Sequence, residues 1–332
     1  MTVKDRVLDR LGRENDSISG EKLAAELGVS RTAVWKAIGE LRDEGYLIEA
    51  AQKRGYRLAA SPDFSAASLA RELAAERLTA DLPDPERFAA LQTLVLGETD
   101  STNKVARELA ARNAPETLIL AAKQTAGRGR LGRSFYSPGG SGLYFSMLLY
   151  PGCAAADASV MTTVAAIAVC RALERLDSGL KPMIKWVNDV YIGNRKVCGI
   201  LTEGQVDFET GTLAFAVPGI GVNIYSPDGG WTADLENRAG AVFSKPCGEL
   251  RTRLAAMIAA EFFRYYPRLR ISDFIGEYRR RMFLTGMEVT VVPIGGENYQ
   301  AVVKGVDDEL RLIVDDGREL KYLSSGEVSL KL

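Results

Sequence analysis

The spacing of apolar residues changes along this 332-residue chain, and that change constrains the fold more than any other feature. Residues 1–60 show helical spacing and end in two short strands, whereas residues 91–282 interleave β-rich runs with helical patterns. Residues 283–332 hold only short alternating runs separated by glycines, and the Ala-rich residues 61–90 between the first two segments read as a helical linker. We therefore expect a multidomain α/β (α+β) protein that ends in a small all-β barrel.

The first sixty residues predict a winged helix-turn-helix. Ser19 caps one amphipathic helix, Gly28 stops it, and Ser30 caps a second helix over residues 30–44, before the two short strands. A recognition helix contacts base edges and phosphates through its N-terminal half, and the loop between the strands forms the wing. The expected DNA contacts are Ser30, Arg31, Thr32, Trp35, Lys36, Lys53 and Arg54. Because the segment holds 11 basic and 10 acidic residues, a protein-interaction module is the alternative.

Composition excludes several classes of chemistry. The chain has no histidine, which rules out Ser-His-Asp and Cys-His nucleophiles and histidine-ligated zinc. The 42 basic and 43 acidic residues nearly cancel, so any DNA contact must be local. The four cysteines lack CxxC spacing and the N-terminus has no apolar leader, so we expect reduced thiols in a cytoplasmic protein without a membrane anchor.

The segment Gly-Arg-Gly-Arg-Leu-Gly-Arg at 127–133 is the sharpest motif. Its glycines free the backbone to wrap a ligand, and its arginines supply fixed charge for carboxylate and phosphate oxygens. A solvated surface loop or an RNA-binding tail is the alternative. The segment follows an apolar strand over 118–122 and precedes another over 143–149, which argues against a tail. We expect a polyanionic ligand here.

Three further motifs lie at predicted strand ends. Lys-Trp-Val-Asn-Asp at 185–189 places a lysine where it can reach into a pocket. Pro-Gly-Ile-Gly-Val-Asn at 218–223 closes the apolar strand 213–217, allows close approach of a ligand and presents an amide. Glu-Thr-Asp-Ser-Thr-Asn at 98–103 leads into a helix. Each motif alone is also compatible with an ordinary strand end, turn or helix cap.

Taken in order, four segments resemble the motifs of biotin-protein ligases: residues 101–103, 124–130, 185–189 and 219–223. With the winged helix, the resemblance extends over nearly the whole chain and is to the bifunctional ligases that also repress the biotin operon. It implies a central mixed-sheet domain of the biotin/lipoate ligase type and an SH3-like C-terminal barrel. It also implies two reactions. The biotin carboxylate first attacks the α-phosphate of ATP with Mg²⁺, and a carrier-domain lysine then attacks biotinyl-adenylate.

The resemblance also assigns residues. Lys185 and Arg130 are expected to be catalytic, because fixed cations stabilise the negative charge that both steps build on oxygen. The expected biotin contacts are Ser101, Thr102, Asn103, Gln124, Gly127, Arg128, Gly129, Arg130 and Lys185. The expected ATP or adenylate contacts are Arg130, Arg133, Phe135, Lys185, Asn188 and Asn223. ATP and Mg²⁺ are expected as cosubstrates and biotin as substrate, with no bound prosthetic group. The metal ligands are not assigned.

Two residues depart from the family pattern: Val187 stands where proline is usual, and Phe135 where tryptophan is common. We expect altered nucleotide affinity rather than lost activity, because Lys185 and Asn188 are retained and Phe135 still packs on a base. The implied partners are a biotin carboxyl carrier domain, operator DNA and a second copy of the chain, in a homodimer promoted by biotinyl-AMP.

Three other functions stay open. A lipoate-protein ligase shares the central fold, although its Arg-x-x-Gly-Gly-Gly stretch is not found here. A non-catalytic transcription factor could use the pocket only to sense biotin. A monofunctional ligase could retain an N-terminal domain that no longer binds DNA.

Overall fold

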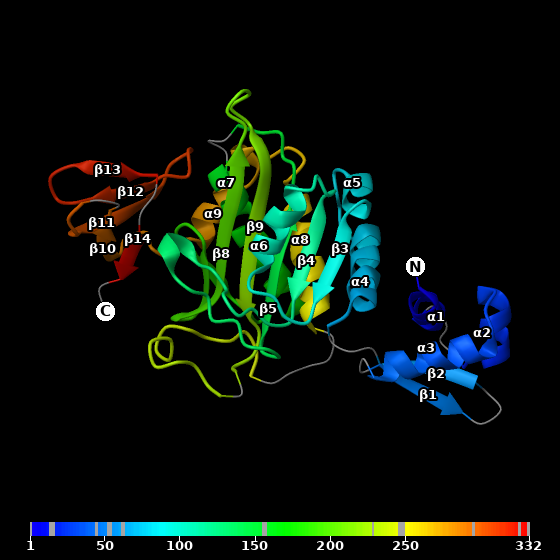
Figure 1. Cartoon of the computed structure of the whole chain (residues 1–332). Coiled ribbons are helices and arrows are strands. Elements are labelled where there is room, and N and C mark those ends of the chain that lie inside the picture. The colour runs from blue at the N-terminus through cyan, green and yellow to red at the C-terminus, as the bar shows by residue number, and fades with distance from the viewer. Residues whose placement is uncertain are drawn as a thin grey trace. The chain divides into compact units, whose positions relative to one another are not determined.

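The computed structural model describes residues 2–12, 17–43, 46–51, 55–60, 64–154, 158–227, 229–244, 250–293, 296–324 and 327–330. Its elements are labelled in Figure 1. The chain divides into two compact units. Among the described residues, the N-terminal unit comprises those up to 75 together with 250–253, and the C-terminal unit comprises the others.

The N-terminal unit begins with three helices, α1 (Val3–Gly12), α2 (Gly20–Leu27) and α3 (Arg31–Asp43), followed by the hairpin of β1 (Leu47–Ala51) and β2 (Gly55–Ala60). Local signals set these helix ends. The Ser19 side chain accepts a hydrogen bond from Lys22 N at 3.1 Å, and Gly28 ends α2 with φ 62°. The predicted helix-turn-helix with a hairpin is confirmed.

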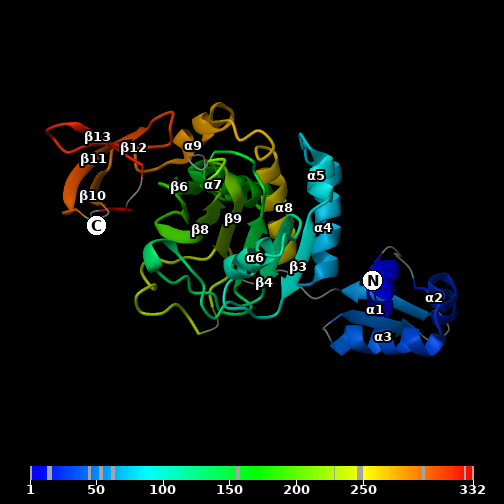
Figure 2. The ribbon, with the colours of Figure 1, turned by 45° about the horizontal axis from the view of Figure 1, so that its top comes forward.

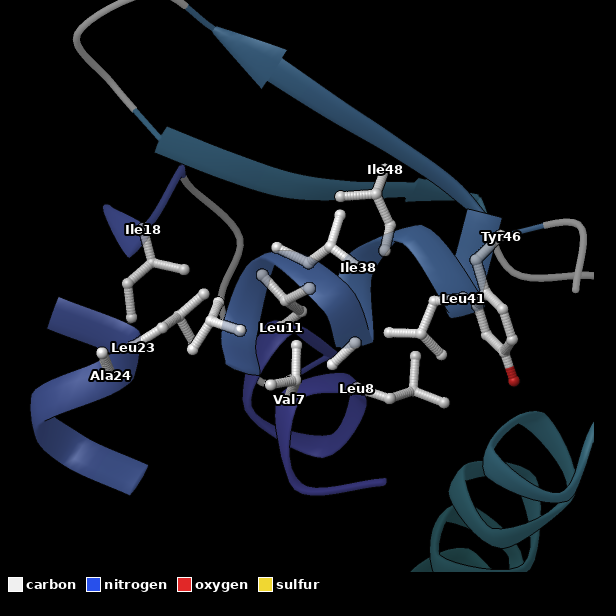
Figure 3. Close-up of a cluster of buried hydrophobic side chains, with 12 residues drawn as sticks. Val7, Leu8, Leu11, Ile18, Leu23, Ala24, Ile38, Leu41, Tyr46 and Ile48 are labelled. Atoms are coloured by element: carbon white, nitrogen blue, oxygen red, sulfur yellow. The ribbon is translucent and has the colours of Figure 1, made fainter. Parts of the chain in front are cut away.

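A core of its own holds this arrangement together. Figure 3 shows apolar side chains of α1, α2 and α3 and of the first strand pointing toward one another. Its buried members are Val7, Leu8, Leu11, Ile18, Leu23, Ala24, Val34, Ala37, Ile38, Leu41, Tyr46 and Ile48. The segment 61–90, expected to be a helical linker, contains α4 (Ala66–Thr79) and α5 (Pro85–Ala89).

A seven-stranded mixed sheet dominates the C-terminal unit. Its strands are β3 (Gln92–Leu96), β4 (Thr117–Ala121), β5 (Gly142–Leu148), β6 (Pro182–Lys185), β7 (Asp189–Ile192), β8 (Arg195–Val206) and β9 (Leu213–Asn223). The order is β3-β4-β5-β9-β8-β7-β6; β3 and β4 run parallel and the other neighbours antiparallel. The mixed sheet expected from the family resemblance is confirmed.

The centre of this sheet is covered on both faces, since every residue of β4 and β5 is buried. Helix α6 (Thr102–Ala110) packs against β4, β5 and β9, whereas α7 (Ala158–Leu176) packs against β6 to β9. Helices α8 (Leu250–Phe263) and α9 (Ile275–Arg281) complete the α-helical elements of the described chain, and two 3₁₀ turns lie at Arg130–Gly132 and Ile271–Asp273. Among these residues, none of the helices combines the length and apolar character needed to span a bilayer.

One strand prediction was wrong. The segment 218–223 was expected to close the strand that begins at Leu213, but β9 continues through it to Asn223. Pro218 lies within the strand, opposite Thr202 of β8. The long pairing of β9 with both β5 and β8 holds this segment extended despite the proline and the two glycines, so its residues lie within the sheet rather than on a turn.

The last strands form a five-stranded antiparallel sheet with the order β13-β12-β11-β10-β14. Figure 2 labels β10 to β13, and Figure 1 labels β14 as well. They are β10 (Glu288–Val292), β11 (Tyr299–Val306), β12 (Leu312–Asp315), β13 (Leu320–Leu323) and β14 (Glu327–Leu330). Within the described part of the chain, β13 and β14 are edges that do not pair with each other. The antiparallel sheet is confirmed, and the closed SH3-like barrel stays a prediction.

The turn between β11 and β12 contacts the residues that follow β6. The Trp186 indole Nε1 donates to Leu310 O at 3.1 Å, and the Trp186 side chain is buried. Arg279 of α9 donates from Nε to Val306 O at 2.8 Å. The buried indole therefore links the segment after β6 to the C-terminal sheet.

A partly buried carboxylate ties α5 to the strands. Glu116 accepts hydrogen bonds from Arg87 at 3.0 and 2.7 Å, from Tyr150 N at 3.0 Å and from the Tyr266 hydroxyl at 2.7 Å. Burial by itself raises the pKa of Glu116, but the hydrogen bonds from Arg87, Tyr150 and Tyr266 and the charge of Arg87 lower that pKa overall. The carboxylate is thus held in its ionised form.

Candidate functional site

A cavity of about 380 Å³ lies between the 127–136 loop, the β6–β7 connection and the strands β8 and β9. Cationic side chains outnumber acidic ones in its lining. The cations are Arg128, Arg130, Arg133, Lys185, Lys196 and Arg238, and the carboxylates are Asp189 and Asp234. This charge balance favours an anionic ligand.

The loop folds back on itself beside the cavity. Phe135 N donates to Gly127 O at 2.8 Å, and Gly129 N donates to Arg133 O at 2.7 Å. A Cβ on Gly127 would overlap Phe135 O and lie 2.6 Å from Ser137 Oγ, so only glycine leaves room for this return. The loop is therefore held by contacts within its own domain, as expected for a loop between two strands rather than a tail.

Arg130 is fixed to the connection between β6 and β7. Its Nη1 donates to Asn188 Oδ1 at 3.0 Å, and Asn188 Nδ2 donates to Ile200 O at 2.8 Å. Lys185, the last residue of β6, lines the same cavity. Two motifs separated by more than fifty residues are thereby joined by a direct hydrogen bond.

The Phe135 ring packs on strand backbone at two glycines, which have no side chain. A Cβ on Gly199 of β8 would come within 3.1 Å of the ring, and a Cβ on Gly221 of β9 within 2.5 Å. The ring also makes an edge contact with Tyr144, with centroids 6.4 Å apart. The aromatic ring thus forms a wall of the cavity because the strands beneath it carry glycine.

Asn223 and Lys196 meet at the far end of these strands. Asn223, the buried last residue of β9, donates from Nδ2 to Lys196 O at 3.4 Å. The Lys196 ammonium lies 2.6 Å from Asp189 Oδ1. This part of the cavity therefore presents an amide beside an ion pair.

A second group of polar residues, buried or partly buried, does not line the cavity. We call Thr102, Asn103, Gln124, Ser146 and Glu203 the Thr102 cluster. Gln124 Oε1 accepts from Thr102 N at 2.9 Å, and Ser146 Oγ lies 2.7 Å from Thr102 Oγ1 and 2.6 Å from Asn103 Oδ1. Asn103 Nδ2 donates to Glu203 Oε2 at 2.8 Å. The cluster joins α6 to β5 and β8.

The N-terminal unit has a cavity of its own, of about 610 Å³. Its lining includes Arg31, Thr32 and Trp35 of α3 together with residues of the α2 start and of β2. The Trp35 side chain is 69% exposed. Of the other expected DNA contacts, Ser30 caps α3 through Ala33 N at 3.1 Å and Lys36 lies 3.9 Å from Glu40, whereas Lys53 and Arg54 lie outside the described residues.

Comparisons with known proteins agree with this division. Residues 4–57 match an HTH domain model, and residues 96–223 match the Biotin/lipoate A/B protein ligase family. The alignment to the Bacillus subtilis protein named "Bifunctional ligase/repressor BirA" shows 33% identity and covers 95% of this chain and 94% of that protein. The chain belongs to the bifunctional ligase/repressor BirA family. The Escherichia coli BirA is 28% identical over 94% of this chain and 92% of its own.

A solved structure supports the ligase part of this assignment. The biotin protein ligase from Aquifex aeolicus, determined in complex with biotin and ATP, is 26% identical with a TM-score of 0.58. The match covers 72% of this chain and 98% of that one. The predicted membership of the biotin ligase and repressor family is confirmed.

For this BirA-family chain, the structure brings together only part of the residues expected at the site. Those that line the 380 Å³ cavity are Arg128, Gly129, Arg130, Arg133, Phe135, Lys185, Asn188 and Asn223. Those that do not line it are Ser101, Thr102, Asn103, Gln124 and Gly127. Arg128 connects the two groups, because its Nη1 lies 3.3 Å from Glu203 Oε1.

Sequence reasoning missed several lining residues of the BirA-family site. Tyr191 and Lys196 lie on the hairpin that follows the Lys185 motif, so their proximity to that motif was a usable signal. Trp231, Asp234, Leu235 and Arg238 come from a segment without helical or strand periodicity. Glu203 was missed as well, although its contacts reach both groups of expected residues.

Proposed function

We propose that this chain is an ATP-dependent biotin ligase that biotinylates a lysine of a biotin carboxyl carrier domain and also represses transcription of biotin synthesis or transport genes. The observation that carries this proposal is the 33% identity to a bifunctional ligase/repressor over 95% of the chain, since it spans both the HTH and the ligase segments. The cationic cavity supports it, because biotin and ATP both carry negative charge where they react.

The cavity cations serve the first step in this proposal. A biotin carboxylate oxygen attacks the α-phosphorus of ATP, the bond to the β-phosphate oxygen breaks, and biotinyl-adenylate and pyrophosphate form. Lys185 and Arg130 stabilise the charge that develops on the phosphate oxygens and on the attacking carboxylate. The Arg130–Asn188 hydrogen bond at 3.0 Å keeps the guanidinium in place without reorganisation.

The nucleotide occupies the end of the cavity that Phe135 and Asn223 line. Adenine packs on the Phe135 ring, the Asn223 amide faces the base edge, and Arg133 and Asn188 contact the phosphates. Mg²⁺ enters with ATP as the MgATP substrate. The carboxylates of Asp189 and Asp234 line the same cavity and would be the protein oxygen ligands closest in type to those that Mg²⁺ prefers.

The ureido ring of biotin lies toward the Thr102 cluster. Ser101, Thr102, Asn103 and Gln124 supply hydroxyl and amide groups, and Gly127, Arg128 and Gly129 supply backbone N–H groups and charge from the loop. In the second step the carrier lysine amine attacks the acyl carbon of the adenylate, AMP leaves with the bonding electrons, and the amine loses a proton. Ordering of residues 127–140 over the adenylate excludes water from the mixed anhydride.

The repressor function uses the N-terminal unit. Arg31, Thr32 and Trp35 of α3 face operator DNA, with Ser30, Lys36 and the wing residues Lys53 and Arg54 beside them. Biotinyl-AMP promotes a homodimer, and pairing of two winged helices raises affinity for a two-part operator. In the same proposal the C-terminal strands belong to an SH3-like barrel.

The decisive experiment measures transfer of labelled biotin from biotin and MgATP to a carrier domain. Lys185→Ala and Arg130→Ala should each lower the rate at least about a hundredfold. Lys181→Ala, four residues upstream of Lys185 and outside the cavity, is the matched control and should leave the rate unchanged. Biotin binding without transfer by the wild-type chain would favour the non-catalytic sensor, and transfer of lipoate in place of biotin would favour a lipoate ligase.

The repressor half is tested separately by gel shift and by sedimentation with and without biotin plus MgATP. A rise in sedimenting mass to that of a dimer, together with tighter operator binding, is the expected result. Mass and DNA binding that both ignore the two substrates would refute the coupling.

A further inference from the structure

Glu203 on β8 receives polar contacts from three sides. Asn103 Nδ2 donates to its Oε2 at 2.8 Å, Arg107 Nη1 to its Oε1 at 2.5 Å, and Arg128 Nη1 to the same Oε1 at 3.3 Å. The carboxyl side chain is 22% exposed. One carboxylate therefore joins helix α6, through Asn103 and Arg107, to the glycine-arginine loop that lines the cavity.

The charge of Glu203 fixes how the Asn103 amide is turned. A carboxylate only accepts hydrogen bonds, so Asn103 must direct its NH₂ group to Glu203 and to Leu201 O, which lies 3.2 Å away. The Asn103 carbonyl then faces Ser146 Oγ and accepts a hydrogen bond from it at 2.6 Å. The opposite orientation of Asn103 would set its oxygen against two acceptors.

The hydrogen bonds continue to Thr102 and Gln124. Ser146 Oγ also donates to Thr102 Oγ1 at 2.7 Å, so Asn103 and Thr102 share the one Ser146 hydroxyl as acceptors. Thr102 N and Oγ1 lie 2.9 and 3.2 Å from Gln124 Oε1. Glu203 thus fixes the orientation of Asn103, and hydrogen bonds connect Asn103 through Ser146 to Thr102 and Gln124.

The position of Asn103 has independent support from strand β9. A Cβ on Gly219 would overlap Asn103 Oδ1, so the strand leaves room for this amide only because the residue is glycine. Arg128, by contrast, is 52% exposed and has a long flexible side chain. Its contact with Glu203 directs the guanidinium toward the Thr102 cluster at one end of the cavity. The two arginines on one carboxylate leave a net positive charge there.

We propose that Glu203 is a positioning residue for the biotin end of the ligand. It orients Asn103, which is linked through Ser146 to Thr102, and it holds Arg128 beside them. This inference rests on the proposed ligase function. It assigns Glu203 no contact with the reacting atoms, so its loss should weaken capture of biotin far more than the chemical step.

The test compares steady-state biotin transfer by the wild-type full-length chain, Glu203→Gln and Glu203→Asp. Glutamine has nearly the same size but no charge, and it introduces a donor that opposes Asn103 or the arginines. The KM for biotin should rise roughly tenfold to a hundredfold, because each lost bond involves a charged group. The kcat and the KM for ATP should stay within about threefold. Glu209→Gln, on the exposed tip of the same hairpin, is the control.

Aspartate keeps the charge, so Glu203→Asp should give a biotin KM between those of wild type and Glu203→Gln. If Glu203→Gln does not fold, the biotin KM of Glu203→Asp alone tests the inference. A biotin KM unchanged in the folded variants, or a lower kcat with an unchanged biotin KM, would overturn the inference. A purely structural role would instead lower the thermal stability and the active fraction of the protein, without raising the KM for biotin selectively over kcat and the KM for ATP. Failure of the wild-type chain to transfer biotin would count against the proposed function, not against Glu203 alone.

Discussion

Replacement of Gly221 by alanine tests the backbone surface beneath Phe135. A Cβ at this position would lie 2.5 Å from Phe135 Cε1, 2.7 Å from Cζ and 3.0 Å from Cδ1. Carbon atoms in van der Waals contact are about 3.5 Å or more apart, so the ring must retreat by about 1 Å. Because β8 and β9 lie beneath the ring, the retreat is into the cavity.

This displacement has a cost in both stability and activity. Insertion of a methyl group into a packed contact typically costs about 1–3 kcal/mol of folding free energy. A loss of about 1.4–2.8 kcal/mol of binding free energy weakens the affinity for a ligand about tenfold to a hundredfold. We expect Gly221→Ala to raise the KM for ATP between about tenfold and a hundredfold, with the chain still folded.

Pyrophosphate release at saturating biotin measures this KM. Gly97→Ala is the control, since a Cβ there meets no heavy atom within 4 Å. In the double variant with Phe135→Ala the clash is gone, so the effect of Gly221→Ala should largely disappear when measured against Phe135→Ala alone. An ATP KM within twofold of wild type for Gly221→Ala, or fully additive effects in the double variant, would refute the reasoning.

Glu116 should make folding stability depend on pH. Its pKa is lowered below the ordinary value of 4.5 in the folded state, so the stability it contributes is complete above pH 4.5 and is lost as the pH falls through the folded pKa. The difference in melting temperature between wild type and Glu116→Gln should therefore shrink as the pH falls from 6 to about 3; a constant difference would contradict this. Burial raises the pKa of the Cys170 thiol to about 12 and that of Cys198 well above its ordinary value, so neither should be alkylated at pH 8 before unfolding, as mass spectrometry of digested protein would show. Trp186→Phe removes the indole donor to Leu310 O and should cost about 1–3 kcal/mol in urea denaturation, and an unchanged midpoint would argue against that bond.

Features set by local physics were predictable from sequence. The caps at Ser19 and Ser30 and the left-handed Gly28 act within a few residues, and they place the helices of the N-terminal unit. The predicted strand 118–122 differs from β4 by one residue at each end. The arginine loop and Lys185 were also predicted as ligand contacts, because their positive charge and the loop glycines are visible in the sequence whatever the fold.

The rest depended on long-range pairing that the sequence does not encode locally. Asn103 contacts Glu203 across 100 residues and Ser146 across 43. The spacing of the motifs therefore could not predict that the Thr102 cluster forms outside the lining of the cavity. Strand β9 extends through Pro218 because both of its neighbours hold it. Closure of the C-terminal strands depends on the pairing of edges, which alternation of apolar residues does not specify.

The long strand β8 carries groups for both ends of the proposed ligand. Gly199 supports the aromatic wall, and Glu203, four residues later on the same face, holds the Thr102 cluster. A strand rises about 3.3 Å per residue, so these two points are roughly 13 Å apart and cannot approach each other. Strand β8 would thus fix the distance between the two parts of the binding site. A biotin analogue with one more methylene in its side chain could keep its contacts at one end of the site only by losing those at the other. We therefore expect the enzyme to bind such an analogue less tightly because of its length, not because of its polarity.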